Sequence, residues 1–332
     1  MAKEITIDDI ARELGISKST VSRALSGKGR IGKETVEKVK AYATEHKYPI
    51  KELYDANAAK TYNIAMITPK SDDEQTAYDL PFFRDCMYGI CDTAFSYNYD
   101  VIVSFMNESP THISRIIANK KVDGVIMNRS VANSDAVNFL KAHNVPFVVI
   151  GPTDSTEIVN VDNPNREGAK ELTEVFLMKG ATKLALLGGD PSHFVTVRRK
   201  QGFFDAYISA KIPENKASMF MNCDNLIRVR SAVDTILEMR MDGIICMDDY
   251  ICELAMTALR ERGVSVPNTI KLATMYDSPK MEASTPSVTG VKYNTTLLGK
   301  NACLKLLELL GEKVEDVIMP LNYQLILRES TK

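Results

Sequence analysis

The sequence lacks the features of a membrane protein, a disulfide-linked secreted protein and several common enzyme classes. No apolar run approaches the roughly 20 residues of a membrane-spanning helix, and the charged start at Lys3 and Glu4 is unlike a signal peptide. The six cysteines form no C-x-x-C pair, so we expect free thiols in a reducing cytoplasm and no metal. The four histidines are widely spaced, and P-loop and G-x-S-x-G motifs are absent, which argues against an enzyme and predicts no cofactor.

The composition indicates a globular protein of two or three domains, with 332 residues of which 45% are apolar and 25% charged. Its charge is unevenly distributed. Residues 1–60 hold 12 lysines and arginines against 9 acidic residues, whereas the remainder holds 29 against 34. A basic N-terminal head on an acidic body is typical of proteins that bind nucleic acid.

The N-terminal segment has the pattern of two short helices joined by a tight turn. Gly15 suits the turn, and Ser17 suits the N-cap of the second helix. The first helix has an apolar face formed by Ile7, Ile10, Ala11 and Leu14. The second exposes side chains that can bond phosphates or base edges: Lys18, Ser19, Thr20, Ser22 and Arg23. This pattern favours a DNA-binding helix-turn-helix over an ordinary helical hairpin, and a third helix is predicted from Lys33 to His46.

The chain alternates between short apolar strands and helices from residue 62 onward. This alternation predicts parallel sheets with helices on both faces. The pattern begins again near residue 184, which indicates two similar lobes with a ligand cleft at the carboxyl ends of their strands.

Motifs along nearly the whole chain carry a family resemblance. They are Thr6-Ile-Asp-Asp-Ile-Ala, Gly15-Ile-Ser, Thr20-Val-Ser-Arg, Pro81-Phe-Phe, Val161-Asp-Asn, Gly168, Arg199, Gly202-Phe, Asp248-Asp, Val266-Pro, Tyr276-Asp and Leu298-Gly. In this order they resemble the LacI family of bacterial transcriptional regulators. The resemblance implies an all-α helix-turn-helix head and an α/β, two-lobed core like the type I periplasmic binding proteins.

The resemblance also implies domain boundaries. We expect a head over 1–49, a hinge over 50–61 and a ligand-binding and dimerisation domain over 62–332. One lobe would take 62–160 and 291–320, and the other 162–289 and 322–332. The chain would cross between them near Val161, Thr289–Val291 and Leu321.

Members of this family are typically homodimers that bind pseudo-palindromic operators, so each monomer would read one half-site. Because the core is followed by no long C-terminal segment, we expect a dimer. The resemblance places Lys18, Ser19 and Arg23 at the bases, with Arg23 bonding a guanine. The predicted DNA-binding set is completed by Thr6, Ser17, Thr20, Ser22 and Thr35.

The hinge departs from the family pattern, in which a leucine enters the minor groove. Tyr48 is followed directly by Pro49, and the segment is one residue short. Ala56 stands where that leucine is expected, and Leu53 or Tyr54 could replace it.

The resemblance places an effector between the lobes. Phe82 or Phe83 would supply an aromatic wall, although either could be a core residue. The predicted polar contacts are Asp162, Arg199, Asp248 and Asp277, with Tyr293, Tyr78 and His193 at the rim. Carboxylates, a guanidinium and an aromatic face suit a sugar. A nucleobase or phosphosugar effector, and a cytoplasmic sugar-binding protein without a DNA role, remain the alternatives.

Overall fold

The computed structural model describes residues 5–26, 31–46, 60–69, 81–106, 111–130 and 134–332. Three helices form the head: α1 (Ile7–Glu13), α2 (Lys18–Ser26) and α3 (Lys33–Glu45). They enclose a small apolar core formed by Ile10, Ala11, Val21, Ala24, Val39 and Ala43. The predicted hinge residues Leu53, Tyr54 and Ala56, and Tyr78, lie outside the described residues.

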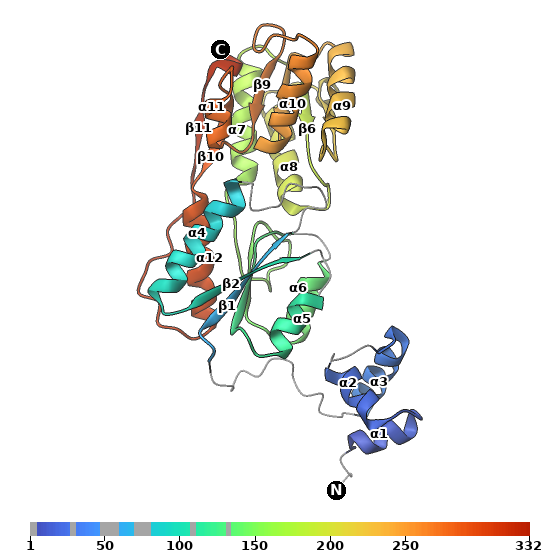
Figure 1. Cartoon of the computed structure of the whole chain (residues 1–332). Helices are drawn as coiled ribbons and strands as arrows, with labels where there is room; N and C mark the ends of the chain where they lie inside the picture. The colour runs from blue at the N-terminus through green and yellow to red at the C-terminus, as the bar shows by residue number, and fades with distance from the viewer. Residues whose placement is uncertain (1–4, 27–30, 47–59, 70–80, 107–110, 131–133) are drawn as a thin grey trace.

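The first lobe is built on a parallel five-stranded sheet in the order β2-β1-β3-β4-β5 (Figure 1). Its strands are β1 (Asn63–Pro69), β2 (Asp100–Met106), β3 (Gly124–Met127), β4 (Phe147–Ile150) and β5 (Asn160–Val161). Its helices are α4 (Pro81–Ser96), α5 (Thr111–Ala118), α6 (Asp135–Ala142) and α12 (Thr295–Leu309). Alternate residues of β1 face opposite ways: Ile64 and Met66 pack toward α4 and α12, whereas Ala65 and Ile67 pack toward α5 and α6.

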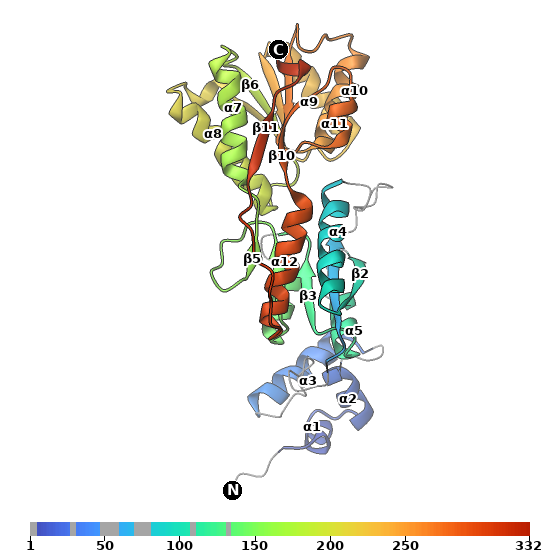
Figure 2. The same ribbon diagram turned by 90° about the vertical axis from the view of Figure 1, so that its left-hand side faces the viewer.

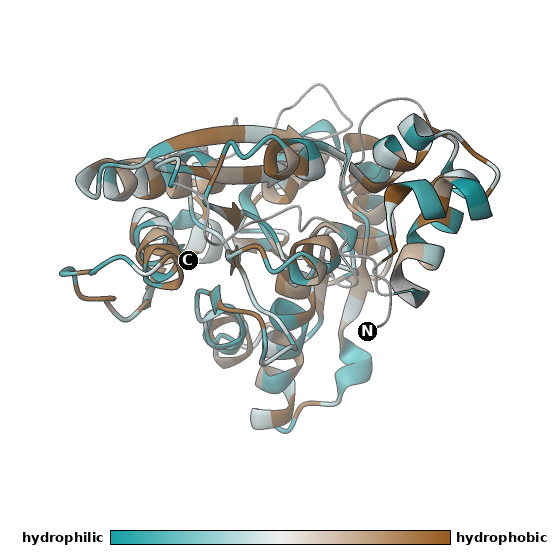
Figure 3. Ribbon diagram, turned by 90° about the horizontal axis from the view of Figure 1, so that it is seen from below, coloured by the Kyte–Doolittle hydropathy of each residue, from teal (hydrophilic) through white to brown (hydrophobic). Residues whose placement is uncertain are grey.

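The second lobe is built on a six-stranded sheet in the order β11-β10-β9-β8-β6-β7. Its strands are β6 (Leu184–Leu187), β7 (Ser218–Phe220), β8 (Gly243–Cys246), β9 (Lys271–Thr274), β10 (Thr289–Tyr293) and β11 (Tyr323–Ile326). Its helices are α7 (Asn165–Met178), α8 (Phe194–Ser209), α9 (Leu226–Glu238), α10 (Asp249–Glu261) and α11 (Pro279–Ala283), with 3₁₀ turns at Glu214–Lys216 and Glu329–Thr331. Only the β10–β11 pair is antiparallel within the described strands. Helices of both lobes carry hydrophilic and hydrophobic residues on different sides, as expected for helices that cover a sheet (Figure 3).

Helix α12 returns from the second lobe to pack beside α4 in the first (Figure 2). The two backbones approach so closely that a Cβ on Gly89 would collide with the Thr296 carbonyl, and one on Gly299 with the Cys86 carbonyl. Only glycine permits this packing at either position. The C-terminal part of the chain therefore completes the core of the first lobe.

The chain crosses between the lobes after β5, after β10 and before β11. The sequence places the second crossing at Thr289–Val291, but these residues pair with β9 and β11 inside the second sheet. The chain leaves that sheet only after Tyr293, so the boundary moves to Asn294. Within the described residues, no helix is both long and apolar enough to cross a membrane.

Candidate DNA-binding and effector-binding sites

Helix α2 presents a polar outer face because its apolar residues turn inward: Val21 and Ala24 are fully buried in the head, and Leu25 packs partly buried against its core. The opposite side carries the exposed side chains of Lys18, Ser19, Ser22 and Arg23. These groups offer an ammonium, two hydroxyls and a guanidinium along one helix face. That combination can bond phosphates and the edges of bases in a major groove.

The hydroxyls of Thr6 and Ser17 cap helices. Thr6 Oγ1 accepts from the Asp9 backbone N–H at 3.3 Å, and Asp9 Oδ2 accepts from the Thr6 N–H at 2.9 Å. Ser17 Oγ accepts from the Thr20 N–H at 3.1 Å and contacts the Thr20 hydroxyl at 2.8 Å. These contacts fix the start of each helix. Thr35 lies half-buried in the first turn of α3.

A buried hydrogen-bond chain links the first crossing to the second lobe. Asn165 Nδ2 donates to Asp162 Oδ1 at 2.9 Å, and Arg199 Nε donates to Asn165 Oδ1 at 3.0 Å. Arg199 also donates to the Met247 carbonyl at the end of β8, and only 8% of the residue is exposed. Burial raises the pKa of Asp162 to about 7, although the charge of Arg199 opposes this shift. The predicted pair Asp162 and Arg199 is thus connected through Asn165, which the sequence reading omits.

Asp248 and Asp277 follow the buried strands β8 and β9, as the sequence predicts, but their oxygens have partners. Asp248 Oδ1 accepts from the Ile251 N–H at 2.8 Å and caps α10. Burial raises the pKa of Asp248. Both oxygens of Asp277 accept from Arg328, at 2.7 and 2.9 Å. We therefore revise the prediction for Asp277: its carboxylate primarily ties the segment after β9 to Arg328, two residues beyond the end of β11.

The aromatic residues at the start of α4 divide between two roles. Phe82 packs against the cores of both lobes, and its ring lies edge-on to Tyr276 with centroids 5.7 Å apart. Phe83 is buried beneath Arg129, whose Cζ lies 5.4 Å from the ring centroid. Phe82 is therefore the residue that spans the space between the lobes.

Arg129 is a residue that sequence reasoning missed. It follows β3 as Asp248 follows β8, so its place after a buried strand was the available signal. Burial, followed by the nearby charge of Arg129, lowers the pKa of His193 to about 4. The ring contact between Phe82 at the start of α4 and Tyr276 after β9 shows that the carboxyl ends of the two sheets face each other, and His193 precedes α8 on the second-lobe side.

Several buried polar groups at these facing edges have no hydrogen-bond partner among the described residues. They are Thr68 Oγ1 after the middle of β1, both amide atoms of Asn128 after β3, and the Tyr293 hydroxyl at the end of β10. Unpaired buried polar groups carry a free-energy cost that a bound polar molecule can remove. This edge is therefore suited to a ligand rich in hydrogen-bonding groups.

Comparison with known proteins agrees with this architecture. Residues 6–49 match the bacterial regulatory proteins of the lacI family, and residues 173–331 match a periplasmic binding protein-like domain. The HTH-type transcriptional regulator MalR of Staphylococcus xylosus is 27% identical, over 98% of each chain. The HTH-type transcriptional repressor PurR of Vibrio parahaemolyticus is 26% identical, again over 98% of each.

Solved structures give the same result. A complex of the transcriptional regulator CelR with cellobiose has a TM-score of 0.74 at 23% identity, covering 98% of this chain and all of that one. The lac repressor dimer bound to operator and the anti-inducer ONPF has a TM-score of 0.69 at 22% identity, covering 99% of both. The predicted fold class is confirmed, and the relatives' names confirm a regulator instead of an enzyme. With a helix-turn-helix head and a ligand-binding core matched along its length, the chain belongs to the LacI family of bacterial DNA-binding transcriptional regulators.

Proposed function

We propose that this regulator is a cytoplasmic repressor that binds a pseudo-palindromic operator as a homodimer and changes its DNA affinity when a sugar binds between its lobes. The unpaired polar groups of Thr68, Asn128 and Tyr293 at the facing sheet edges carry the proposal. Sugar hydroxyls both donate and accept, and so can satisfy a hydroxyl and an amide together. Phe82 adds an aromatic surface for the C–H face of a sugar ring.

The names of the relatives support this ligand class. One solved relative is a complex with cellobiose, and one sequence relative is named MalR. A nucleobase is the second candidate, favoured by the relative named PurR and by an aromatic side chain between the lobes. The effector contacts we propose are Phe82, Phe83, Asp162, Arg199, Asp248 and Tyr293.

Dimerisation is supported by an apolar surface on the first lobe. Helix α4 exposes 63% of Tyr88 and 80% of Phe95, which are seven residues apart and so lie on one side of the helix. The neighbouring edge strand β2 exposes Phe105. Exposed aromatic residues on adjacent elements are typical of an association surface. Sedimentation of wild type and Phe95→Glu tests this: a dimer should become a monomer.

The DNA half of the proposal assigns base contacts to Lys18, Ser19 and Arg23, with phosphate contacts from the remaining predicted head residues. The test is a fluorescence-anisotropy titration with the DNA upstream of the protein's own gene, at several salt concentrations. Arg23→Ala should weaken specific binding by about 1–3 kcal/mol, with less effect on random DNA. Equal specific affinity for wild type and Arg23→Ala would remove Arg23 from the base-reading set.

The effector half is tested in the same titration with sugars and nucleobases added separately, after a thermal-shift screen for stabilising compounds. A stabilising sugar that changes operator affinity supports the proposal. Stabilisation by nucleobases alone would favour the second candidate. Absence of salt-sensitive DNA binding would contradict the DNA-binding role itself.

A further inference from the structure

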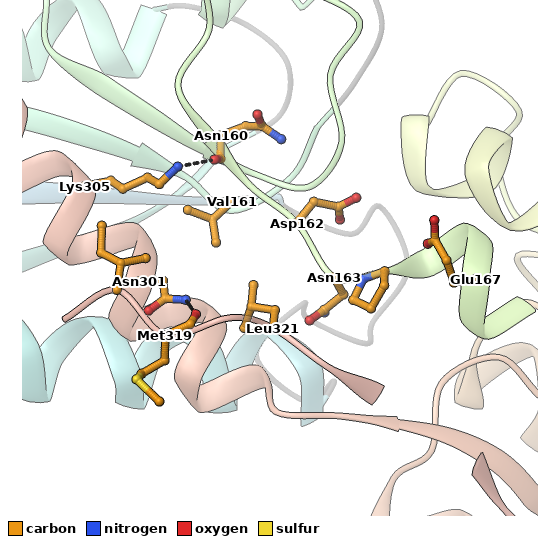
Figure 4. A pocket seen from close by; sticks show the side chains of 11 residues that line it. Asn160, Val161, Asp162, Asn163, Glu167, Asn301, Lys305, Met319 and Leu321 are labelled. Carbon is orange, nitrogen blue, oxygen red and sulfur yellow. Dashed lines mark hydrogen bonds between the residues drawn. The ribbon is translucent and has the colours of Figure 1, made fainter. Parts of the chain in front are cut away.

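A cavity with a volume of about 430 Å³ lies beside the chain crossings (Figure 4). Residues from Asn160 to Pro164 at the first crossing form one wall, and Leu321 at the third crossing forms another. The remaining wall includes Asn301 and Lys305 of α12 in the first lobe, and Glu167 of α7 in the second. The cavity therefore touches two of the three crossings and a helix from each lobe.

Two buried amides leave acceptors unpaired at this cavity. Asn301 is 1% exposed; its Nδ2 donates to the Met319 carbonyl at 2.7 Å, but its Oδ1 has no partner within the described chain. Asn163 is 5% exposed, and its Oδ1 likewise lacks a partner there. In Figure 4 the two side chains approach the space beside Leu321 from opposite sides. Since an unpaired buried acceptor is costly, a bound donor would stabilise both amides.

The other lining groups define the chemistry of such a molecule. Lys305 donates one N–H to the Asn160 carbonyl at 3.2 Å, so its ammonium has further hydrogens to offer. Glu167 provides the opposite charge at the second-lobe wall, and Val161 and Leu321 add apolar surface. A molecule that donates to amide oxygens, accepts from an ammonium and carries C–H surface is a small neutral polyol. A cationic amine would suit the amide oxygens and the carboxylates of Asp162 and Glu167 but would leave the Lys305 ammonium without an acceptor, whereas polyol hydroxyls can both donate and accept.

We propose that this crossing cavity, defined by Asn163, Glu167, Asn301, Lys305 and Leu321, is a second effector site that binds a monosaccharide or sugar alcohol. It shares Asp162 with the proposed site between the sheet edges but is otherwise distinct from it, since Phe82, Phe83, Arg199 and Asp248 do not line it. The volume lies in the usual range for small-molecule pockets.

The position of the cavity gives its ligand a route to regulation. Any change in the relative orientation of the lobes alters the backbone at the crossings, where Asn163 and Leu321 lie. A ligand bound between these segments and α12 favours the lobe arrangement in which its contacts are best. Occupancy of the crossing cavity is therefore coupled to the effector between the lobes and to operator affinity.

Hydrogen–deuterium exchange on the full-length protein tests the proposal, with D-ribose, D-glucose and mannitol as separate probes at millimolar concentration. At least one probe is expected to slow exchange in peptides covering 160–167 and 318–321. Asn301→Leu removes one unpaired acceptor, and Lys305→Met removes the ammonium with little change in volume. Both variants should lose that protection. Because Lys305 is only partly buried, Lys305→Met is expected to fold even if the buried substitution Asn301→Leu prevents folding.

The matched control is Phe82→Leu, which alters the site between the lobes and should retain protection at 160–167. Three results would overturn the proposal: no protection of these peptides by any probe, as expected if the cavity holds only water; protection confined to peptides at the facing sheet edges; or protection that persists in both cavity variants. Loss of protection in Phe82→Leu, with protection retained in both cavity variants, would assign the slowed exchange to the site between the lobes.

Discussion

The two lobes share a βα architecture but differ in how the polar groups at their facing edges are paired. In the second lobe, Arg199, Asp248 and Asp277 all have hydrogen-bond partners within the protein. In the first lobe, Thr68 Oγ1 and both amide atoms of Asn128 have none in the described structure. The charged groups of the second lobe are thus organised before a ligand arrives, although its Tyr293 hydroxyl is unpaired, whereas the first lobe offers a hydroxyl and an amide that a ligand would pair.

The largest expected effect comes from breaking a buried ion pair of the second lobe. Arg328→Met leaves the Asp277 carboxylate buried without its bidentate partner, since the two side chains are 13% and 4% exposed. We expect the free energy of unfolding to fall by about 3–5 kcal/mol, measured by urea denaturation. A matched control is Arg198→Met, whose pair with Asp154 is far more exposed and should contribute less than about 1 kcal/mol. Similar losses in both variants would contradict the distinction.

The next effect concerns Arg199, which joins the first crossing to the second sheet. Arg199→Met leaves the Asn165 amide oxygen and the Met247 carbonyl without this donor. We expect a loss of about 1–3 kcal/mol for each acceptor left unpaired. Calorimetric unfolding measures the stability, and a variant as stable as wild type would show that water replaces the guanidinium.

The first lobe should respond in the opposite way. Asn128→Leu removes an unpaired buried amide, so it should leave stability nearly unchanged or increase it. Its effector affinity should fall roughly tenfold, because two hydrogen bonds to the ligand are lost at about 0.5–1.5 kcal/mol each. Calorimetric titration with the effector found by screening measures this. A strongly destabilised variant with normal affinity would overturn the contrast between the lobes.

The smallest effect, when counted for a single pH unit, is a pH dependence at the first crossing. The pKa of Asp162 is raised by burial to about 7 in the folded chain, above the value of about 4 expected when unfolded. The folded state therefore binds more protons between these values, and its stability falls as pH rises from 4 to 7, by at most about 1.4 kcal/mol per unit. Asp162→Asn should lack this component while keeping an oxygen for Asn165. If the melting temperatures of wild type and Asp162→Asn change with pH in the same way, the assignment of this pH dependence to Asp162 is refuted.

Local patterns predicted several positions in the fold, because helix caps and apolar faces follow from short stretches of sequence. Helical spacing predicted the apolar face of α1, where Ile10 and Ala11 are buried, and the family resemblance named Asp248, which lies after the buried strand β8. The Asp277–Arg328 pair could not be found this way. It depends on β11 returning antiparallel to β10, which brings together residues 51 positions apart.

The same limitation applies to Asn165 and Phe82. Asn165 links Asp162, which follows β5, to Arg199 of α8. The spacing of apolar residues along the chain does not show that these two elements come together. The sequence left Phe82 and Phe83 equivalent, and only the packing separates a residue between the lobes from one beneath Arg129.

The return of α12 to the first lobe has a consequence for synthesis on the ribosome. The head can form once about its first 46 residues have emerged, since the described residues of its core run from Ile5 to Ala43. The first lobe, by contrast, lacks Leu298, Ala302 and Leu306 of its core until α12 has emerged. We expect the nascent chain to expose a folded head first, while the surface of α4 that packs against α12 remains open to chaperones until α12 has emerged from the ribosome.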